Sequence, residues 1–469
     1  MSARRAAVGA AVTSILAFAL TTPAWGALPP AFGGSLSLPA QATPEHPDPR
    51  QVTTPLEASV VDAVFDTLYA SDARGHVTPV LAAGMPVREG ELLRIPLRED
   101  VLRQDGERLR ATDVVASLNR ALGNPRSAWL LAPIARRDAG LAIDTPDEHT
   151  LAIRLSDPDA DLVHLLACRP LAITVGRRGL LGTGPYRPRM RDGELALGAF
   201  PAALRGEPYL RQLHLVAPTP RNTEARDLAL GRLDASWVGS ELYGLAQRTR
   251  SALGRSSPVL LIRNRAAGPL ARDDAWGKMA SLVDRRRLRR LGLEATDSVS
   301  HAIPAPAIPE GAGELPRRLS LLARAGHPLE AALAQALAAM LDDAGVLVEV
   351  RTADAEAYDQ ALAGGRYDLR LETIVPPLLS PSGMLGAAFA ATGQAGQAHA
   401  LARLPNLIVP QPARQAAARL DALVLGRRSD VLTHPRDLGG VEAHAFDGLL
   451  HLADLYLRRP DAAGHGSAP

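Results

Sequence analysis

Apolar and polar residues alternate along three short segments of the chain, and this period of two predicts β-strands. The three segments are residues 33–40, 91–100 and 149–158. The stretch that follows the first of them, residues 41–55, is rich in proline and polar residues and predicts a loop. The pattern therefore begins with a strand that runs into a long loop.

Elsewhere the apolar residues recur at the spacing of a helix. In residues 56–70, the side chains of Val60, Val64 and Leu68 fall on one side, which predicts a helix with one apolar face. Thr112 is placed to cap a second helix at its start. The apolar residues behind this cap are Val114, Val115, Leu118 and Leu122. Strands mixed with helices, without an internal repeat, predict an α/β or α+β chain.

The N-terminus has the three parts of a secretory signal peptide. Arg4 and Arg5 come first, an uncharged apolar run follows over residues 6–20, and a small-residue site lies at residues 24–26. The run is shorter than the roughly 20 residues that span a bilayer. We therefore expect export, with cleavage after residue 26. A retained membrane anchor is the alternative, and the paired arginines leave general secretory and twin-arginine export both open.

Length and charge limit the remaining classes of protein. A chain of 469 residues is too long for one ordinary core and predicts two or three domains. Its positive charge is almost all arginine, since Lys278 is the only lysine, but 52 basic residues stand against 50 acidic ones. The densest basic run, residues 284–290, is typical of a solvated helix face. The composition therefore predicts no nucleic-acid partner.

The sequence carries no signature of catalysis. Its one cysteine, Cys168, lies in an apolar stretch, cannot form an internal disulfide, and is predicted to be a buried and unreactive thiol. The twelve histidines include no metal-binding spacing such as His-Glu-x-x-His. No Gly-x-Ser-x-Gly motif marks a nucleophile. We expect no enzymatic activity, no metal and no cofactor.

One short motif asks for an explanation of its own: Gly182-Thr183-Gly184-Pro185-Tyr186. It could cradle a phosphate, line an oxyanion hole or turn the chain. A phosphate loop needs a longer glycine-rich arch and a lysine, and no lysine is near. Pro185 also removes a donor and favours extended geometry in the residue before it. The motif therefore predicts a tight turn into an extended segment.

The order of several weak motifs resembles the extracellular solute-binding proteins that serve peptide and nickel ABC importers, known as family 5. Tyr186 closes the family's "GTGPY" motif, and other matching segments lie before and after it. They are Val77–Ala82, Leu97–Val101, Asp105–Gly106, Ala111–Val114, Ala225–Trp237, Leu260–Leu288 and Asp447–Leu457. The resemblance covers almost the whole chain after the predicted signal peptide. Each motif is unspecific alone, and their order and spacing carry the resemblance.

The resemblance implies an α/β fold of two lobes, the type II periplasmic-binding-protein fold with an extra inserted subdomain. A ligand would lie in the cleft between the lobes, which would close around it by a hinge motion. The GTGPY turn would be the point where the inserted subdomain returns the chain to lobe I. The implied segments are 1–26 for the signal peptide, 27–70, 182–267 and 436–460 for a discontinuous lobe I, 71–181 for the inserted subdomain, 268–435 for lobe II, and 461–469 for a disordered tail.

The resemblance also implies candidate ligand-binding residues. Ser236 and Trp237 follow an aspartate after which the family places cleft residues, although Trp237 could equally be a core residue. Asp48 belongs to an Asp-Pro pair like one near the family's cleft, although such a pair is often only a turn. We therefore expect Asp48, Ser236 and Trp237 near the cleft as candidates, with these alternatives open.

The second lobe departs from the peptide-binding members. These carry a tryptophan and an acidic stretch after a strand, and an aspartate there holds the amino terminus of the peptide. The matching strand here is residues 367–373, and neither the tryptophan nor the aspartates follow it. A buried ammonium without a carboxylate is costly. Either the ligand has no ammonium there, or another acid such as Glu372, beside Thr373, takes the role, or binding is lost.

These observations together predict a periplasmic solute-binding component of an ABC importer. It would capture a small solute between its lobes, with peptide as the default, and deliver it to permease subunits in the inner membrane. We expect a monomer. The alternative is a degenerate relative that acts as a sensor or an assembly subunit and binds protein rather than solute.

Overall fold

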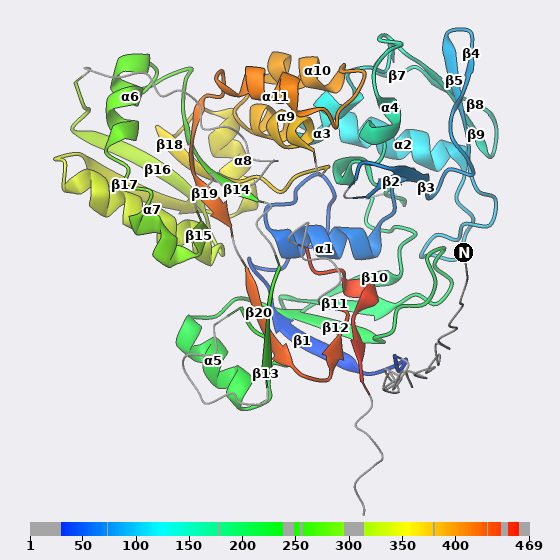
Figure 1. Ribbon diagram of the computed structural model, residues 1–469, viewed down its shortest axis with the longest axis horizontal. Helices are drawn as coiled ribbons and strands as arrows, with labels where there is room; N and C mark the ends of the chain where they lie inside the picture. The colour runs from blue at the N-terminus through cyan, green and yellow to red at the C-terminus, as the bar shows by residue number, and fades with distance from the viewer. Residues whose placement is uncertain are drawn as a thin grey trace, which may run out of the picture.

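A computed structural model gives the fold (Figure 1). It describes residues 30–72, 74–176, 179–237, 248–253, 257–294, 314–378, 380–428, 430–441 and 449–458. The predicted signal peptide of residues 1–26 and the predicted tail of residues 461–469 lie outside the described residues. Among the described helices, none has both the length and the apolar character needed to cross a membrane.

The first sheet has four strands in the order β1-β12-β11-β10. Their bounds are Ser35–Pro39 for β1, Tyr186–Arg191 for β10, Glu194–Ala199 for β11 and Gln212–Val216 for β12. The strand β1 runs parallel to β12, and the other two pairs are antiparallel. The predicted strand of residues 33–40 is thereby confirmed. Helix α1 (Pro55–Val64) shares a hydrophobic core with this sheet.

Helix α1 begins as its sequence suggests but ends earlier than predicted. Thr54 accepts a hydrogen bond from the backbone N–H of Glu57 at 3.2 Å, and the two residues form a capping box. The predicted helix of residues 56–70 was too long, because Phe65 is extended and the chain then forms the strand β2 (Tyr69–Ser71). This strand pairs with β3 (Val77–Pro79).

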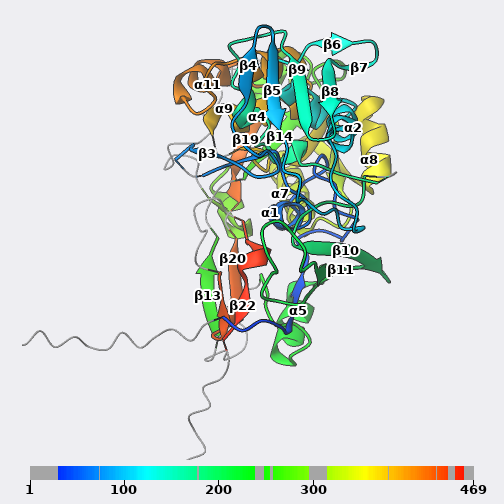
Figure 2. The same cartoon turned by 90° about the vertical axis from the view of Figure 1, so that its right-hand side faces the viewer.

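The segment after β3 forms a second four-stranded sheet, with the order β4-β5-β9-β8 (Figure 2). The strands are Val87–Glu89, Leu92–Pro96, Ile143–Asp147 and Thr150–Arg154 for β4, β5, β8 and β9. Their helices are α2 (Ala111–Leu122), α3 (Pro125–Ala128) and α4 (Leu162–Leu165), and the short pair β6 (Arg136–Arg137) and β7 (Gly140–Leu141) lies between them. The strands predicted within residues 91–100 and 149–158 are confirmed.

The start of α2 differs from the prediction. Arg110, not Thr112, is the N-cap residue, and its backbone N–H donates to the Asp113 carboxylate at 3.0 Å. The acid at the third helical position satisfies the N-cap backbone, so the helix begins one residue before the predicted cap. Thr112 is an ordinary residue of its first turn.

The largest sheet has six strands in the order β15-β19-β14-β18-β16-β17. Their bounds are Pro258–Arg263 for β14, Leu293–Glu294 for β15, Arg318–Arg324 for β16, Leu347–Ala353 for β17, Leu369–Thr373 for β18 and Ala422–Arg428 for β19. The strands β16, β17 and β18 are parallel, and β14 is antiparallel to both its neighbours. The helices described in this part are α6 (Asp273–Ser281), α7 (Pro328–Asp342), α8 (Ala355–Ala363), α9 (Pro381–Ala391), α10 (Ala395–Ala402) and α11 (Pro410–Ala417).

Two antiparallel strands, β13 (Arg248–Ala252) and β20 (Val431–Pro435), connect this sheet to the first one. The chain runs from β13 into β14 and from β19 back into β20 (Figure 1). The remaining elements of the lower part are α5 (Arg221–Ala229) and the short pair β21 (Leu438–Gly439) and β22 (Tyr456–Leu457). We keep the terms lobe I, inserted subdomain and lobe II for the predicted segments, whose boundaries remain a prediction.

One hydrophobic core joins the inserted subdomain to the helices α9, α10 and α11. Trp129, which is 2% exposed, belongs to the same cluster of buried side chains as Leu385 and Phe389 of α9. A Cβ atom on Gly386 would lie 2.4 Å from the Trp129 ring. Figure 1 shows α9, α10 and α11 between the six-stranded sheet and helices α2, α3 and α4. The described parts of these two segments therefore pack as one body.

The GTGPY motif turns the chain into β10, as predicted, since β10 begins at Tyr186. Its glycines are required by close packing, because neither Gly182 nor Gly184 has a positive φ. A Cβ atom on Gly182 would lie 2.1 Å from the Val64 carbonyl oxygen, and one on Gly184 would lie 2.7 Å from the Val64 carbonyl carbon. The motif thus lies directly against the end of α1.

Candidate functional site

A cavity of about 430 Å³ lies where lobe I, the inserted subdomain and lobe II meet. Its walls come from the loop after β1, the start of α3, the end of β16, α8, β18 and the end of α9. The lining residues that carry polar groups are Thr43, Glu45, Gln51, Thr53, Glu57, Asn124, Arg126, Arg324, His327, Tyr358, Asp359, Arg370 and Glu372. A pocket of this size with converging polar groups is typical of a small-molecule site.

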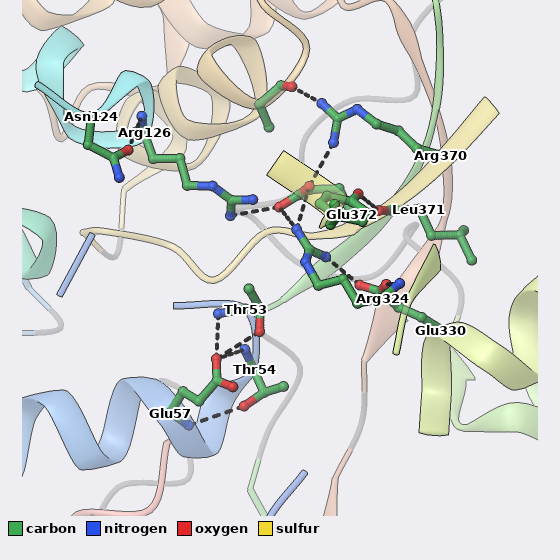
Figure 3. A network of polar contacts seen from close by, with 12 residues as sticks. Thr53, Thr54, Glu57, Asn124, Arg126, Arg324, Glu330, Arg370, Leu371 and Glu372 are labelled. Atoms are coloured by element: carbon green, nitrogen blue, oxygen red, sulfur yellow. Dashed lines mark hydrogen bonds and ion pairs between the residues drawn. The ribbon is translucent and has the colours of Figure 1, made fainter. Parts of the chain in front are cut away.

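Glu372 on β18 is the centre of the wall from lobe II. Its side chain is fully buried, and three arginines surround its carboxylate (Figure 3). Arg324 donates to both carboxylate oxygens at 2.9 and 2.8 Å, and Arg370 donates at 2.7 Å. The guanidinium of Arg126, which comes from the inserted subdomain, lies 2.8 Å from the carboxylate. Glu372 therefore holds residues of two segments together.

The charges in this wall favour an ionised Glu372. Burial alone opposes ionisation, but the positive charges of Arg126, Arg324 and Arg370 outweigh burial and lower the pKa of Glu372 to about 2. Arg324 also donates to Glu330 at 2.5 Å. Counted as ionised, the cluster has three arginines against two glutamates and so one positive charge in excess.

The opposite wall belongs to lobe I and is built around the start of α1. One oxygen of Glu57, Oε2, accepts hydrogen bonds from the Thr53 backbone N–H at 2.7 Å, the Thr53 hydroxyl at 2.8 Å and the Thr54 backbone N–H at 3.1 Å. Figure 3 shows these bonds converging on a single oxygen. The capping box thus fixes the position of a carboxylate in the cavity wall.

His327 lies at the contact between the two lobes. Its Nε2 atom is 3.1 Å from the Thr53 hydroxyl, and the neighbouring Gly326 carbonyl accepts a hydrogen bond from the Thr43 backbone N–H at 2.9 Å. Burial, followed by the charge of Arg324, lowers the pKa of His327 to about 4. The imidazole is therefore neutral at neutral pH.

This low pKa predicts a loss of stability in mild acid. The pKa of histidine in the unfolded chain is about 6.5, so the unfolded chain binds the proton more tightly and stability falls as the pH drops from about 6.5 toward 4. Between pH 7 and pH 4.5 the wild type should lose about 2 kcal/mol more unfolding free energy than His327→Gln. Urea unfolding at both pH values measures this difference, and equal losses would contradict it.

Smaller cavities continue along the same interface. One of about 50 Å³ shares Arg126 and Ala391 with the main cavity and is also lined by Arg50, Arg169 and Thr373. It shares Arg169 with a third cavity of about 240 Å³. The described interface therefore offers a series of adjoining cavities, of which the first is the largest.

The structure places three of the predicted site residues on adjoining cavities and the other two away from them. Glu372 lines the main cavity and Thr373 lines the small one beside it. Asp48 lines a further cavity of about 60 Å³, which shares Glu45, Gln51 and Glu57 with the main cavity, and it forms a two-point ion pair with Arg50. The ligand-binding role of these three residues remains a prediction.

Ser236 and Trp237 lie away from the described cavities. Ser236 is buried, and its hydroxyl donates to Glu224 at 2.5 Å. The indole N–H of Trp237 donates to the Pro39 carbonyl at 2.7 Å, and its ring packs against the core of the first sheet. Neither residue is among those lining the cavities described above. Their contacts are those of packing residues, and a ligand contact for them stays a prediction.

Sequence reasoning missed most of the polar cavity wall: Glu57, Arg126, Arg324, His327 and Arg370. Two of them had a signal. Arg370 and Glu372 are two apart on an otherwise apolar strand, so both point to one face of the sheet. Glu57 is the acid of a Thr-x-x-Glu capping box. Arg126, Arg324 and His327 had no signal, since they reach the site only through tertiary packing.

The arrangement supports binding more directly than catalysis. Among the described residues, no group of three histidine, cysteine, aspartate or glutamate side chains could hold a metal ion. Cys168 is 1% exposed, as predicted, and burial raises the pKa of its thiol, which disfavours the nucleophilic thiolate. What the described cavity presents is fixed charge from three segments of the chain.

Comparison with known proteins agrees with this description. Residues 76–254 match the family model described as bacterial extracellular solute-binding proteins, family 5, middle part. The matched segment contains most of the inserted subdomain and the chain that follows it through β10, β11 and β12. It also contains the GTGPY motif.

Solved structures share the fold over almost the whole chain. The murein tripeptide binding protein MppA of Escherichia coli has a TM-score of 0.72 and 16% identity, covering 91% of this chain and 99% of MppA. NikA of Staphylococcus aureus, in complex with Ni(L-His)2, has a TM-score of 0.71 and 14% identity, covering 91% of this chain and 100% of NikA. The oligopeptide-binding protein AppA of Bacillus subtilis, in complex with a nonapeptide, has a TM-score of 0.69 and 14% identity, covering 92% of this chain and 100% of AppA.

At these identities the solved structures show the fold alone, and that fold is the predicted two-lobed α/β arrangement. Family and fold are those of binding proteins, and the members of this family are extracellular or periplasmic. The matched segment and the shared fold together agree with the resemblance that the sequence motifs predicted: residues 76–254 are similar to family 5 of the bacterial extracellular solute-binding proteins, and almost the whole chain shares the fold of solved solute-binding proteins.

Proposed function

We propose that this chain is the periplasmic solute-binding component of an ABC importer. It captures a small solute, with peptide as the class we favour, in the 430 Å³ cavity and delivers it to permease subunits in the inner membrane. The observation that carries the proposal is the cavity itself, whose charged walls come from three segments far apart in the sequence. A ligand in this position would bridge all three, which is how binding favours a closed state.

The favoured solute class rests on the family and on the charges of the cavity. Solved relatives bind different solutes: AppA was solved with a nonapeptide and NikA with Ni(L-His)2. The described cavity wall has no cluster of metal ligands and has both carboxylates and guanidinium groups. Charges of both signs suit the two ends of a peptide better than they suit a bare metal ion or a sugar. We propose that the chain performs no catalysis.

One observation favours the alternative role of a sensor or assembly subunit. The inserted subdomain and the helices α9, α10 and α11 share a hydrophobic core, in which Trp129 and Phe389 are almost fully buried. A wide opening between these segments would expose that core to water at about 25 cal/mol per Å² of apolar surface. A relative that no longer opens widely could keep the fold and lose the solute.

Thermal unfolding of residues 27–469 against a panel of solutes tests the proposed function. The panel contains free amino acids, di- to pentapeptides, sugars and nickel. A solute that binds only the folded state at 100 times its Kd adds about 2.7 kcal/mol to the unfolding free energy and raises the midpoint. We expect a reproducible rise with the peptides. A flat response from folded protein free of co-purified ligand would contradict the importer role and favour the alternative.

A further inference from the structure

The acid best placed to hold a positive charge in the cavity is Glu57 of lobe I. The three hydrogen bonds from Thr53 and Thr54 all go to its Oε2 atom. Its other oxygen, Oε1, has no hydrogen bond or ion pair to any described residue, and the side chain lines both the main cavity and the adjoining cavity of about 60 Å³. A carboxylate in a cavity wall that is held by three hydrogen bonds to one oxygen, and whose other oxygen is unpaired among the described residues, is a preorganised cation site.

Glu372 is the less suitable acid. Its carboxylate already accepts from Arg324 and Arg370 and contacts Arg126, and no part of its side chain is exposed to solvent. An ammonium placed there would displace one of these guanidinium groups or add a fourth positive charge beside them. The acid that resembles the family's missing clamp in sequence is therefore already neutralised in the structure.

Arg126 supplies the opposite charge on the other side of the cavity. One of its nitrogens contacts Glu372 at 2.8 Å, while its side chain remains 29% exposed. Nη1 makes this contact, and the other two nitrogens of the guanidinium group, Nε and Nη2, have no partner among the described residues. The side chain lines both the main cavity and the small cavity. With one positive charge in excess in the cluster, these donors suit a carboxylate.

We propose that the cavity binds a small zwitterion, whose amino group lies against Glu57 Oε1 and whose carboxylate lies against Arg126. This inference rests on the proposed function and assigns the two residues that set its specificity. Figure 3 shows the two side chains on different elements, Glu57 at the start of α1 and Arg126 at the start of α3. The ligand's amino group is thus held by lobe I, and lobe II contributes the neutral network around Glu372.

Isothermal titration with alanine peptides of two and three residues tests this assignment. Each peptide is used with free ends, with an acetylated amino end and with an amidated carboxyl end. Glu57→Gln removes the charge but keeps an acceptor for the capping box, so the variant should fold. Glu349→Gln is the matched control, because Glu349 is an exposed acid of β17 that lines none of the cavities described here. The melting midpoint of each variant without peptide checks its folding.

For the wild type we expect each blocked end to weaken binding at least tenfold. In Glu57→Gln the free peptide should bind at least tenfold more weakly and no better than its acetylated form, while amidation should still weaken binding. Glu349→Gln should bind as the wild type does. Equal affinity of free and blocked peptides, or unchanged binding in Glu57→Gln, would overturn the inference.

The outcome separates this inference from the proposed function. If a sugar or nickel raised the melting midpoint and these peptides did not bind, the proposed solute-binding function would still hold, but the zwitterion site would be refuted. Binding of blocked peptides as tightly as free ones would do the same. Absence of binding for every solute in the panel would refute both.

Discussion

Replacing Glu372 with glutamine should lower the unfolding free energy by about 3–5 kcal/mol, the usual cost of removing one partner from a buried ion pair. Glutamine has nearly the same shape, so the loss is mainly electrostatic. Arg324 and Arg370 are buried, and without Glu372 only Glu330 remains to compensate them. The loss also frees Arg126 from lobe II. Urea unfolding of both proteins at neutral pH measures the difference.

Glu349→Gln is the control for this experiment. Glu349 pairs with Arg351 at 2.8 Å on the exposed strand β17, where solvent screens the interaction. We expect this substitution to change stability little. A loss for Glu372→Gln no larger than that for Glu349→Gln would show that the arginine cluster does not hold the inserted subdomain to lobe II.

Trp129→Ala should cost about 3–5 kcal/mol as well, as large-to-small changes of buried aromatic residues do. The ring is 2% exposed and lies directly over Gly386 of α9. Its indole N–H donates to the Arg126 carbonyl at 3.0 Å, so the substitution also loosens the turn that positions the Arg126 side chain. We therefore expect weaker peptide binding besides lower stability, measured by urea unfolding and by titration.

Leu230→Ala provides the comparison for the tryptophan. Leu230 is 60% exposed at the end of α5, where truncation leaves no cavity. If Trp129→Ala lowered the unfolding free energy as little as Leu230→Ala does, the packing between the inserted subdomain and α9 would not contribute to stability. It would also remove the observation that favours the alternative role.

Much of the fold followed from local pattern. The strands within residues 33–40, 91–100 and 149–158 alternate clearly, and each forms as predicted. The errors lay at element ends, where tertiary contacts decide. Helix α1 stops at Val64, whose carbonyl accepts hydrogen bonds from Gly184 and from the Gln104 side chain instead of continuing a helix. Such partners, 40 residues or more away, leave no local signal.

The cavity was harder to predict than the fold. Resemblance to the family pointed to Glu372, and this residue does line the cavity. The same reasoning could not show that three arginines neutralise it, because Arg126 and Arg324 lie far from it in the sequence. Glu57 is recognisable in sequence only as a helix cap. That it also faces the cavity depends on how lobe I meets lobe II.

Hydrogen–deuterium exchange, with and without the solute that raises the melting midpoint most, tests the central claim most directly. If the cavity is the binding site, exchange should slow at residues 43–54 of lobe I and at residues 325–327 of lobe II, which both line the cavity and contact each other there. The exposed strand β4, which lines none of the cavities described here, should exchange as before. Protection elsewhere, with no change in these two loops, would contradict binding in the cavity.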